Sequence, residues 1–387
     1  MAGEARVSIQ RLNNPPPDLE LGQTRAALDY AVALPQAGTN ADTGILFYIH
    51  GWAQRFNDGY SHKLLPYLAD RHNVAAVAVD YQGAALFHNP QLGVPADFFE
   101  KLREHYGVTI QVTPNIHPLR IVLHVAKLLA ENGVRQLHPD CHLINKSGYC
   151  NFGLLPALDH IQVLGDLLKR HGFNKKRLFA IGTSYGGYIG LLLAKLAPNS
   201  WRLLIDNCGF STPRDAFDCV HGITSDNQDL RIQVRTPVAF SPHPQSPHFF
   251  GPAEEAVRTL AQREHYPAGA AYPHVYSYHS RQDSVAAPAH KAAAAEAMGR
   301  SMAFDLTMVG EADLDGRIFK TPDHGFKASM RDLFDLTYDR WRPHAQTMPA
   351  VTDFDLNSRI ILPCPGKDYV VTYADGRAEL SIRRTDF

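Results

Sequence analysis

Residues Lys176–Pro198 read KRLFAIGTSYGGYIGLLLAKLAP, and this stretch decides the fold. The apolar run at 178–181 predicts a buried strand, and residues Tyr188–Leu196, which are rich in leucine, predict a helix. The turn between them carries Gly-Thr-Ser-Tyr-Gly, whose central serine is Ser184. A serine between a strand and a helix, with a glycine two positions before and after it, is typical of a nucleophile that projects from a tight turn. We therefore expect Ser184 to be a catalytic nucleophile.

Strand-like and helix-like segments alternate on both sides of this stretch. The main predicted strands are continuously apolar, which is typical of parallel strands covered by helices on both faces. Strands are predicted at 6–12, 27–34, 44–49, 74–81, 201–209, 275–279 and 303–309, and helices at 60–71, 155–171, 287–298 and 327–340. The pattern predicts a single α/β domain over residues 1–387, built on a doubly wound, mostly parallel sheet.

Three segments depart from this alternation. Residues 84–151 form a first insertion with helix-like pieces near 98–106 and 119–132, and such long excursions are often functional. Residues 210–274 form a second insertion, rich in proline, aromatic residues and histidine, which we expect to be a cap or lid. Residues 350–387 predict a C-terminal β extension of three short strands separated by turns.

A serine nucleophile needs a histidine that takes its proton and an acid that orients the histidine. On a sheet of this kind the chain order is serine, acid, histidine, and each residue follows a strand. Asp283 and His324 meet both conditions, and Gly325 lets the chain turn sharply after the histidine. Asp283 is also suited to cap the next helix, and Asp206, at the end of the preceding strand, is the alternative acid.

The negative charge that develops on the substrate oxygen needs backbone N–H donors. We expect one donor from Tyr185, directly after the nucleophile, and the other from Trp52, in the turn after the strand that ends in His50-Gly51, with Ala53 next to it. The side chain of His50 is expected to make structural hydrogen bonds rather than act as a second base.

The composition excludes several classes of protein. With 38 basic and 39 acidic residues the chain has no general attraction to nucleic acid or anionic membranes, and no apolar run is long enough for a membrane span. The N-terminus lacks a secretory pattern, and the five cysteines predict neither a disulfide framework nor a zinc site, so a cytoplasmic protein is expected. No motif for a cofactor or metal is present, and the spacing of His243 and His248 is interpreted as cap surface.

These motifs together resemble the α/β-hydrolase superfamily over residues of roughly 45–340. The turn at 182–188 and the stretch ending in Asp283-Ser284-Val285 look like the prolyl-oligopeptidase-related branch. Other stretches are similar to an uncharacterised bacterial family of α/β-hydrolase-like proteins, a domain of unknown function: Tyr149–Gly153, Ala157–His160, Ser184–Tyr188, Ala194–Pro198 and Ile205–Asn207. The resemblance implies the serine-hydrolase fold and supports the three catalytic residues, and it supplies no substrate.

The function expected from these residues is hydrolysis of a carboxylic ester, with a small acyl or carbohydrate acyl group, through an acyl-enzyme. The expected partner is therefore a small-molecule ester, and the oligomeric state stays open. Three alternatives remain. The same residues suit an acyltransferase or a peptidase of the prolyl-oligopeptidase type, and a hydrolase scaffold can also serve a non-catalytic binding protein.

Overall fold

The computed structural model describes residues 6–52, 54–84, 91–93, 97, 100, 103–104, 107, 109, 141–144, 149–216, 232–235, 240–241 and 243–385. Most of the first predicted insertion, 84–151, lies outside these residues, as do the helices expected at 119–132 and over most of 98–106. Parts of the second insertion, 210–274, and Ala53 also lie outside them.

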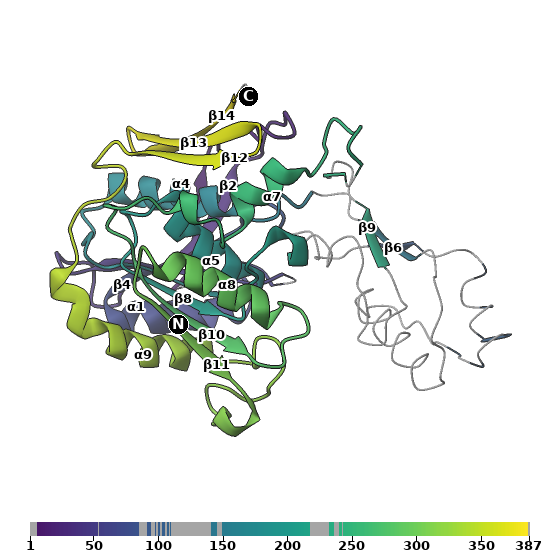
Figure 1. Cartoon of the computed structure of the whole chain (residues 1–387). Helices are drawn as coiled ribbons and strands as arrows, with labels where there is room; N and C mark the ends of the chain where they lie inside the picture. Colours follow the sequence, from purple (N-terminus) through teal and green to yellow (C-terminus); the bar gives the residue numbers. More distant parts are fainter. Residues whose placement is uncertain are drawn as a thin grey trace.

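An eight-stranded sheet forms the centre of the molecule (Figure 1). Its strand order is β1-β2-β4-β3-β7-β8-β10-β11; β2 runs antiparallel to both neighbours, and every other pairing is parallel. The strands are β1 Ser8–Leu12, β2 Leu28–Ala33, β3 Gly44–Ile49, β4 Val74–Val79, β7 Leu178–Thr183, β8 Leu203–Asn207, β10 His274–Ser280 and β11 Phe304–Val309. The expected doubly wound, mostly parallel sheet is confirmed.

Helices cover both faces of this sheet. The inner strands β3, β4, β7 and β8 are therefore almost entirely buried. One core contains side chains of α4, α5 and α8, and the other contains side chains of α1 and α9. The helices are α1 Ser61–His72, α4 Leu154–Arg170, α5 Tyr185–Leu196, α8 Pro288–Gly299 and α9 Met330–Trp341. The helix after the serine turn begins at Tyr185 rather than at Tyr188, so the turn is tighter than predicted.

Both excursions contribute strands to one small sheet. Its members are β5 Gln91–Gly93, β6 Cys141–Ile144 and β9 Ile232–Arg235. β6 pairs antiparallel with β5 from its own excursion and parallel with β9 from the other. Residues about ninety positions apart in sequence, such as Cys141 and Ile232, are therefore paired.

The C-terminal segment forms a separate antiparallel sheet of three strands, β12 Arg359–Cys364, β13 Lys367–Ala374 and β14 Arg377–Arg384. The glycines of its two turns, Gly366 and Gly376, have positive φ angles. This sheet lies over α4 and α7 Pro252–Arg258. Short 3₁₀ helices complete the described elements at Arg263–His265, Glu311–Asp313 and Arg342–Thr347. Among the described residues, no helix has the length and apolar character that crossing a membrane requires.

Candidate active site

Ser184 lies in a strained turn between β7 and α5. Its φ of 54° and ψ of −124° are unusual for a residue with a side chain, and its N–H donates to the carbonyl of Asn207 at 2.8 Å. A Cβ at Gly182 would lie 2.2 Å from the carbonyl oxygen of Gly186, and one at Gly186 would lie 2.1 Å from that of Ile49. Only glycine fits at these two positions, which confirms the steric reason given for the motif.

The histidine and the acid come from two other loops at the carboxyl end of the sheet. His324 follows β11, and its Nε2 lies 2.7 Å from the Oγ of Ser184. Its Nδ1 lies 2.8 Å and 3.0 Å from the carboxylate oxygens of Asp283, which follows β10. Three residues from separate parts of the chain thus form one line of hydrogen bonds. The Asp283 side chain is fully buried, whereas that of His324 is 18% exposed.

Asp283 is held as a carboxylate. Its Oδ1 accepts hydrogen bonds from the backbone N–H groups of Val285 at 2.9 Å and Ala286 at 2.8 Å. Burial alone would raise the pKa of Asp283, but the hydrogen bond and charge of His324, together with the two N–H donors, lower it below its usual value. The ionised form of Asp283 is therefore the stable one, as an orienting acid requires.

Asp206, the alternative acid, faces elsewhere. Its Oδ2 lies 2.6 Å from the ammonium of Lys291 and accepts a hydrogen bond from Ser277 at 2.7 Å. Its Oδ1 accepts the N–H of Gly209 at 2.7 Å. A Cβ at Gly187, in the first turn of α5, would lie 2.2 Å from the same Oδ1. Asp206 therefore supports the base of the serine turn, and its oxygens are engaged away from His324.

Both residues expected to stabilise the oxyanion lie beside Ser184. Tyr185 is the first residue of α5, where backbone N–H groups have no acceptor within the helix. The ring of Trp52 stacks on that of Tyr185 with centroids 4.4 Å apart. A Cβ at Gly51 would lie 3.3 Å from the Cβ of Ser184, so the turn that carries Trp52 packs directly on Ser184.

The side chain of His50 is fully buried below this turn. Its Nε2 lies 3.2 Å from the carbonyl of Val79, its Nδ1 lies 3.1 Å from the carbonyl of Gly51, and its ring stacks on Tyr81. These contacts are structural, as expected.

Phe210 is a residue of the site that the sequence analysis did not single out. Its ring lies nearly parallel to that of His324, with centroids 6.1 Å apart, and 5.6 Å from that of Trp52. Phe210 follows the end of β8, the strand next to β7. Its position after a strand of the sheet was the feature of the sequence from which its place in the site could have been predicted. Trp52, Tyr185 and Phe210 form an aromatic wall beside His324.

One group of possible metal ligands occurs in the described part of the chain, formed by Cys208, Asp283 and His324. It does not fit a metal ion, because Asp283 and the Nδ1 of His324 are already bonded to each other. Burial also raises the pKa of the Cys208 thiol, which disfavours the thiolate that a metal binds. His243 and His248 belong to no such group among these residues.

A family model described as "Protein of unknown function (DUF2920)" matches residues 14–382. No curated protein matches the chain. With its β7-turn-α5 unit and mostly parallel sheet covered on both faces, the chain has an α/β-hydrolase fold.

Several solved structures are similar to it. Pyrococcus horikoshii acylaminoacyl peptidase is 13% identical with a TM-score of 0.45, and the match covers 87% of this chain and 42% of that one. Thermogutta terrifontis esterase 2, phosphonylated by cyclosarin, is 13% identical with a TM-score of 0.43, and the match covers 88% and 95% of the two chains. A Mycobacterium tuberculosis puromycin-hydrolyzing peptidase is 15% identical with a TM-score of 0.45, over 90% and 40%. The chain thus spans about two fifths of the length of the two peptidases.

Proposed function

This chain belongs to the DUF2920 family of proteins of unknown function, and we propose that it is a serine hydrolase that cleaves carboxylic esters. The observation that carries the proposal is the continuous line of hydrogen bonds from the Oγ of Ser184 through His324 to Asp283, with distances of 2.7 Å and 2.8 Å. Such a line lets a neutral imidazole accept the serine proton while the carboxylate stabilises the imidazolium that forms.

The proposed reaction has two halves. The Oγ of Ser184 attacks the ester carbonyl carbon as its proton passes to the Nε2 of His324. The tetrahedral intermediate then collapses, the bond to the alcohol oxygen breaks, and His324 returns the proton to that oxygen. In the second half, water gives a proton to His324 and attacks the acyl-enzyme, and Ser184 recovers its proton as the acid leaves.

The proposed oxyanion donors are the backbone N–H groups of Tyr185 and Trp52. The position of Tyr185 at the N-terminus of α5 supports this role, because the helix dipole adds a favourable field for a developing negative charge. The contact between Gly51 and Ser184 supports Trp52 as the second donor, since it holds the following residue against the nucleophile.

The substrate proposed is an ester with a small acyl group, which includes acyl esters of carbohydrates. The partly exposed ring of Trp52, which packs on the buried rings of Tyr185 and Phe210, supports an apolar acyl group, because it offers surface for contact and few hydrogen-bonding atoms. An acyl-enzyme can also pass its acyl group to another alcohol or form from an amide, so the test includes both acceptors and amides.

The test measures hydrolysis of phenyl esters of increasing acyl length, acetylated sugars and the matching anilides, with and without added sugar. We expect the short esters to be cleaved and a fluorophosphonate probe to label the wild type. Ser184→Ala should lower turnover by roughly four to six orders of magnitude and abolish labelling. Ser211→Ala is the matched control, because its hydroxyl has no hydrogen-bond partner among the described residues and the residue follows Phe210 in the chain.

Equal labelling of wild type and Ser184→Ala would contradict the nucleophile. Anilides cleaved faster than the matching esters would instead assign a peptidase, and acylated sugar in place of free acid would assign an acyltransferase.

A further inference from the structure

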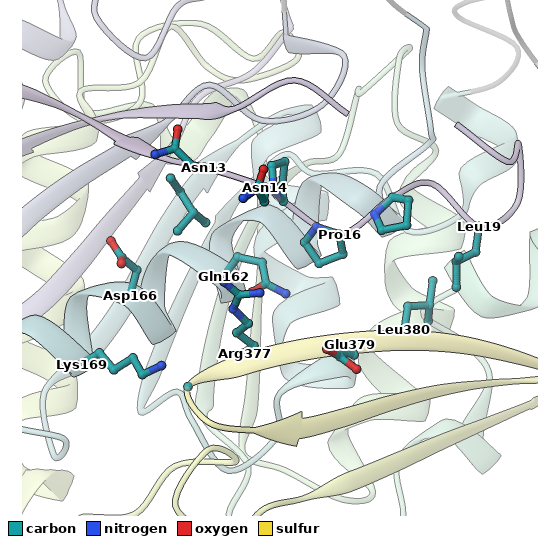
Figure 2. Close-up of a pocket in the computed structure, with 14 residues that line it drawn as sticks. Asn13, Asn14, Pro16, Leu19, Gln162, Asp166, Lys169, Arg377, Glu379 and Leu380 are labelled. Atoms are coloured by element: carbon teal, nitrogen blue, oxygen red, sulfur yellow. The ribbon is translucent and has the colours of Figure 1, made fainter. Parts of the chain in front are cut away.

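A cavity of about 490 Å³ lies on the side of the molecule formed by the N-terminal segment 12–19, α4 and the β13–β14 hairpin (Figure 2). None of Ser184, Asp283 and His324 lines it. Its volume is within the range of pockets that bind small molecules, which is about 300–1,000 Å³.

The walls of this cavity are fixed by contacts with the core. The side-chain amide of Gln162, on α4, donates to the carbonyl of Ala378 on β14. Gly376, in the hairpin turn, lies against the aliphatic part of Lys169, since a Cβ there would be 2.9 Å from its Cδ. The opposite rim is held by Asp18, whose Oδ1 accepts the N–H groups of two following residues. The cavity is therefore formed by segments that are fixed to one another in the folded protein.

The charged side chains that line the cavity differ in whether they are paired. Asp166 accepts a hydrogen bond from Tyr30 at 2.7 Å and lies 3.0 Å from Arg170, so its charge is compensated. Lys169 and Arg377 form no ion pair within the described part of the chain, and neither does Glu379. Figure 2 shows Lys169 and Arg377 directed into the cavity from the helix and the hairpin. The lining thus offers two cations and one carboxylate that have no counter-ion among the residues that the structure describes.

Two neighbouring side chains of opposite charge on β14 suit the two ends of a short peptide. Arg377 and Glu379 are two positions apart on β14, so they lie on the same face with Cα atoms roughly 7 Å apart. An extended dipeptide spans about the same length between its ammonium and its carboxylate. Leucine and proline side chains, including Leu12, Pro16 and Leu380, supply an apolar wall beside the charges.

We propose that this cavity binds a zwitterionic dipeptide with apolar side chains. Arg377 and Lys169 bind its carboxylate, for which the planar guanidinium is well suited, and Glu379 binds its ammonium. The apolar side chains of the dipeptide lie against Leu12, Pro16 and Leu380. This site is independent of the proposed ester hydrolysis, because it shares no residue with the catalytic group.

The test is calorimetric binding to the 387-residue chain with Ser184→Ala, a change that prevents cleavage of the probes. The probes are Leu-Leu, its N-acetyl derivative, which lacks the ammonium, and its amide, which lacks the carboxylate. At low ionic strength we expect Leu-Leu to bind about two- to fivefold more tightly than either derivative, which is the usual size of an exposed charge pair.

Variants assign each charge to its partner. Arg377→Gln should reduce the preference for Leu-Leu over its amide, because Lys169 remains as a cation for the carboxylate, and Glu379→Gln should remove the preference over the N-acetyl derivative. Arg383→Gln is the matched control on the same strand, because Arg383 is exposed and does not line the cavity.

Equal affinity for all three probes, no binding, or preferences that are unchanged in Arg377→Gln and Glu379→Gln would each overturn the proposal. None of these results bears on ester hydrolysis, which is measured separately with the wild type.

Discussion

Two groups of buried charged and polar side chains can be compared in this protein. One is the line Ser184, His324 and Asp283 at the carboxyl end of the central sheet. The other is an ion pair between Glu20 and Arg258, whose side chains are 3% and 0% exposed. Each joins parts of the chain that are far apart in sequence, and each contains an acid whose pKa is below its usual value although burial opposes this.

The second group is closed. All five N–H donors of the Arg258 guanidinium have acceptors: both carboxylate oxygens of Glu20, the backbone and side-chain oxygens of Asn151, and the carbonyl of Glu254. Glu20 also accepts the hydroxyl of Tyr369 at 2.7 Å. This network links the N-terminal segment, α7 and the C-terminal sheet.

The first group is open at one end. Asp283 is satisfied by backbone and histidine donors, but the line ends at the hydroxyl of Ser184, and His324 keeps partial exposure. A closed network stabilises the fold because no polar group is left unpaired, whereas an open one leaves a hydroxyl available, as the proposed nucleophile requires. Burial and the lowered pKa of the acid are common to both groups and do not distinguish them. The difference is that the first group ends at the hydroxyl of Ser184, whereas the second group has no such end.

The largest difference is expected when each acid is neutralised in turn. Asp283→Asn should lower kcat/KM by roughly 10⁴-fold, because an amide stabilises the wrong tautomer of His324 and cannot balance an imidazolium. The melting temperature should change little beside this effect. Steady-state ester hydrolysis and thermal unfolding measure the two quantities on the same sample.

Asp206→Asn is the matched control for this prediction, since Asp206 is the other acid that the sequence offered as the partner of His324. It should mainly destabilise the fold, because Lys291 would keep a buried charge without a counter-ion. A greater loss of kcat/KM in Asp206→Asn than in Asp283→Asn would move the orienting role to Asp206.

A smaller effect, on stability rather than chemistry, is expected for the closed network. Glu20→Gln leaves Arg258 buried and charged, and the loss of one partner of such a pair destabilises by about 3–5 kcal/mol. Urea unfolding monitored by fluorescence gives this difference. Glu255→Gln, on the same helix as Arg258, breaks only a surface pair with Arg214 and should cost about 0–1 kcal/mol. Equal effects of the two variants would mean that the network contributes no more than a surface pair.

The smallest expected effect is the pH dependence of the stability difference between the wild type and Glu20→Gln. Burial raises the pKa of Glu20, but the charge and hydrogen bonds of Arg258 outweigh it and lower the pKa. The stability contributed by the carboxylate is therefore fully present above the unfolded-state pKa of about 4.3 and is lost as the pH falls through the lower folded-state value. The gap in melting temperature between wild type and Glu20→Gln should narrow from pH 6 to pH 3. A gap that widens on acidification would show that Glu20 is protonated in the folded protein.

Local patterns were sufficient for the central elements. The strand at 178–181 and the steric role of the glycines around Ser184 could be predicted, because the strand, the turn and the close contacts all involve a few neighbouring residues. Most strands and helices of the central domain lie within a few residues of their predicted bounds for the same reason. The start of α5 was misplaced because Tyr185 and the two glycines after it are poor indicators of a helix, and packing against β7 overrides that preference.

The sequence by itself determined the class of fold and the chain order of Ser184, Asp283 and His324, because periodicity and turn residues act locally. Only the tertiary structure shows that Asp283 faces His324 and that Asp206 faces Lys291, since both acids follow strands in the sequence. The pairing of β6 with β9, the Glu20–Arg258 network and the cavity beside Arg377 also depend on it. Each of these features forms where segments far apart in sequence come into contact. Whether two such segments fit each other is not visible in the hydrophobic pattern of either segment alone.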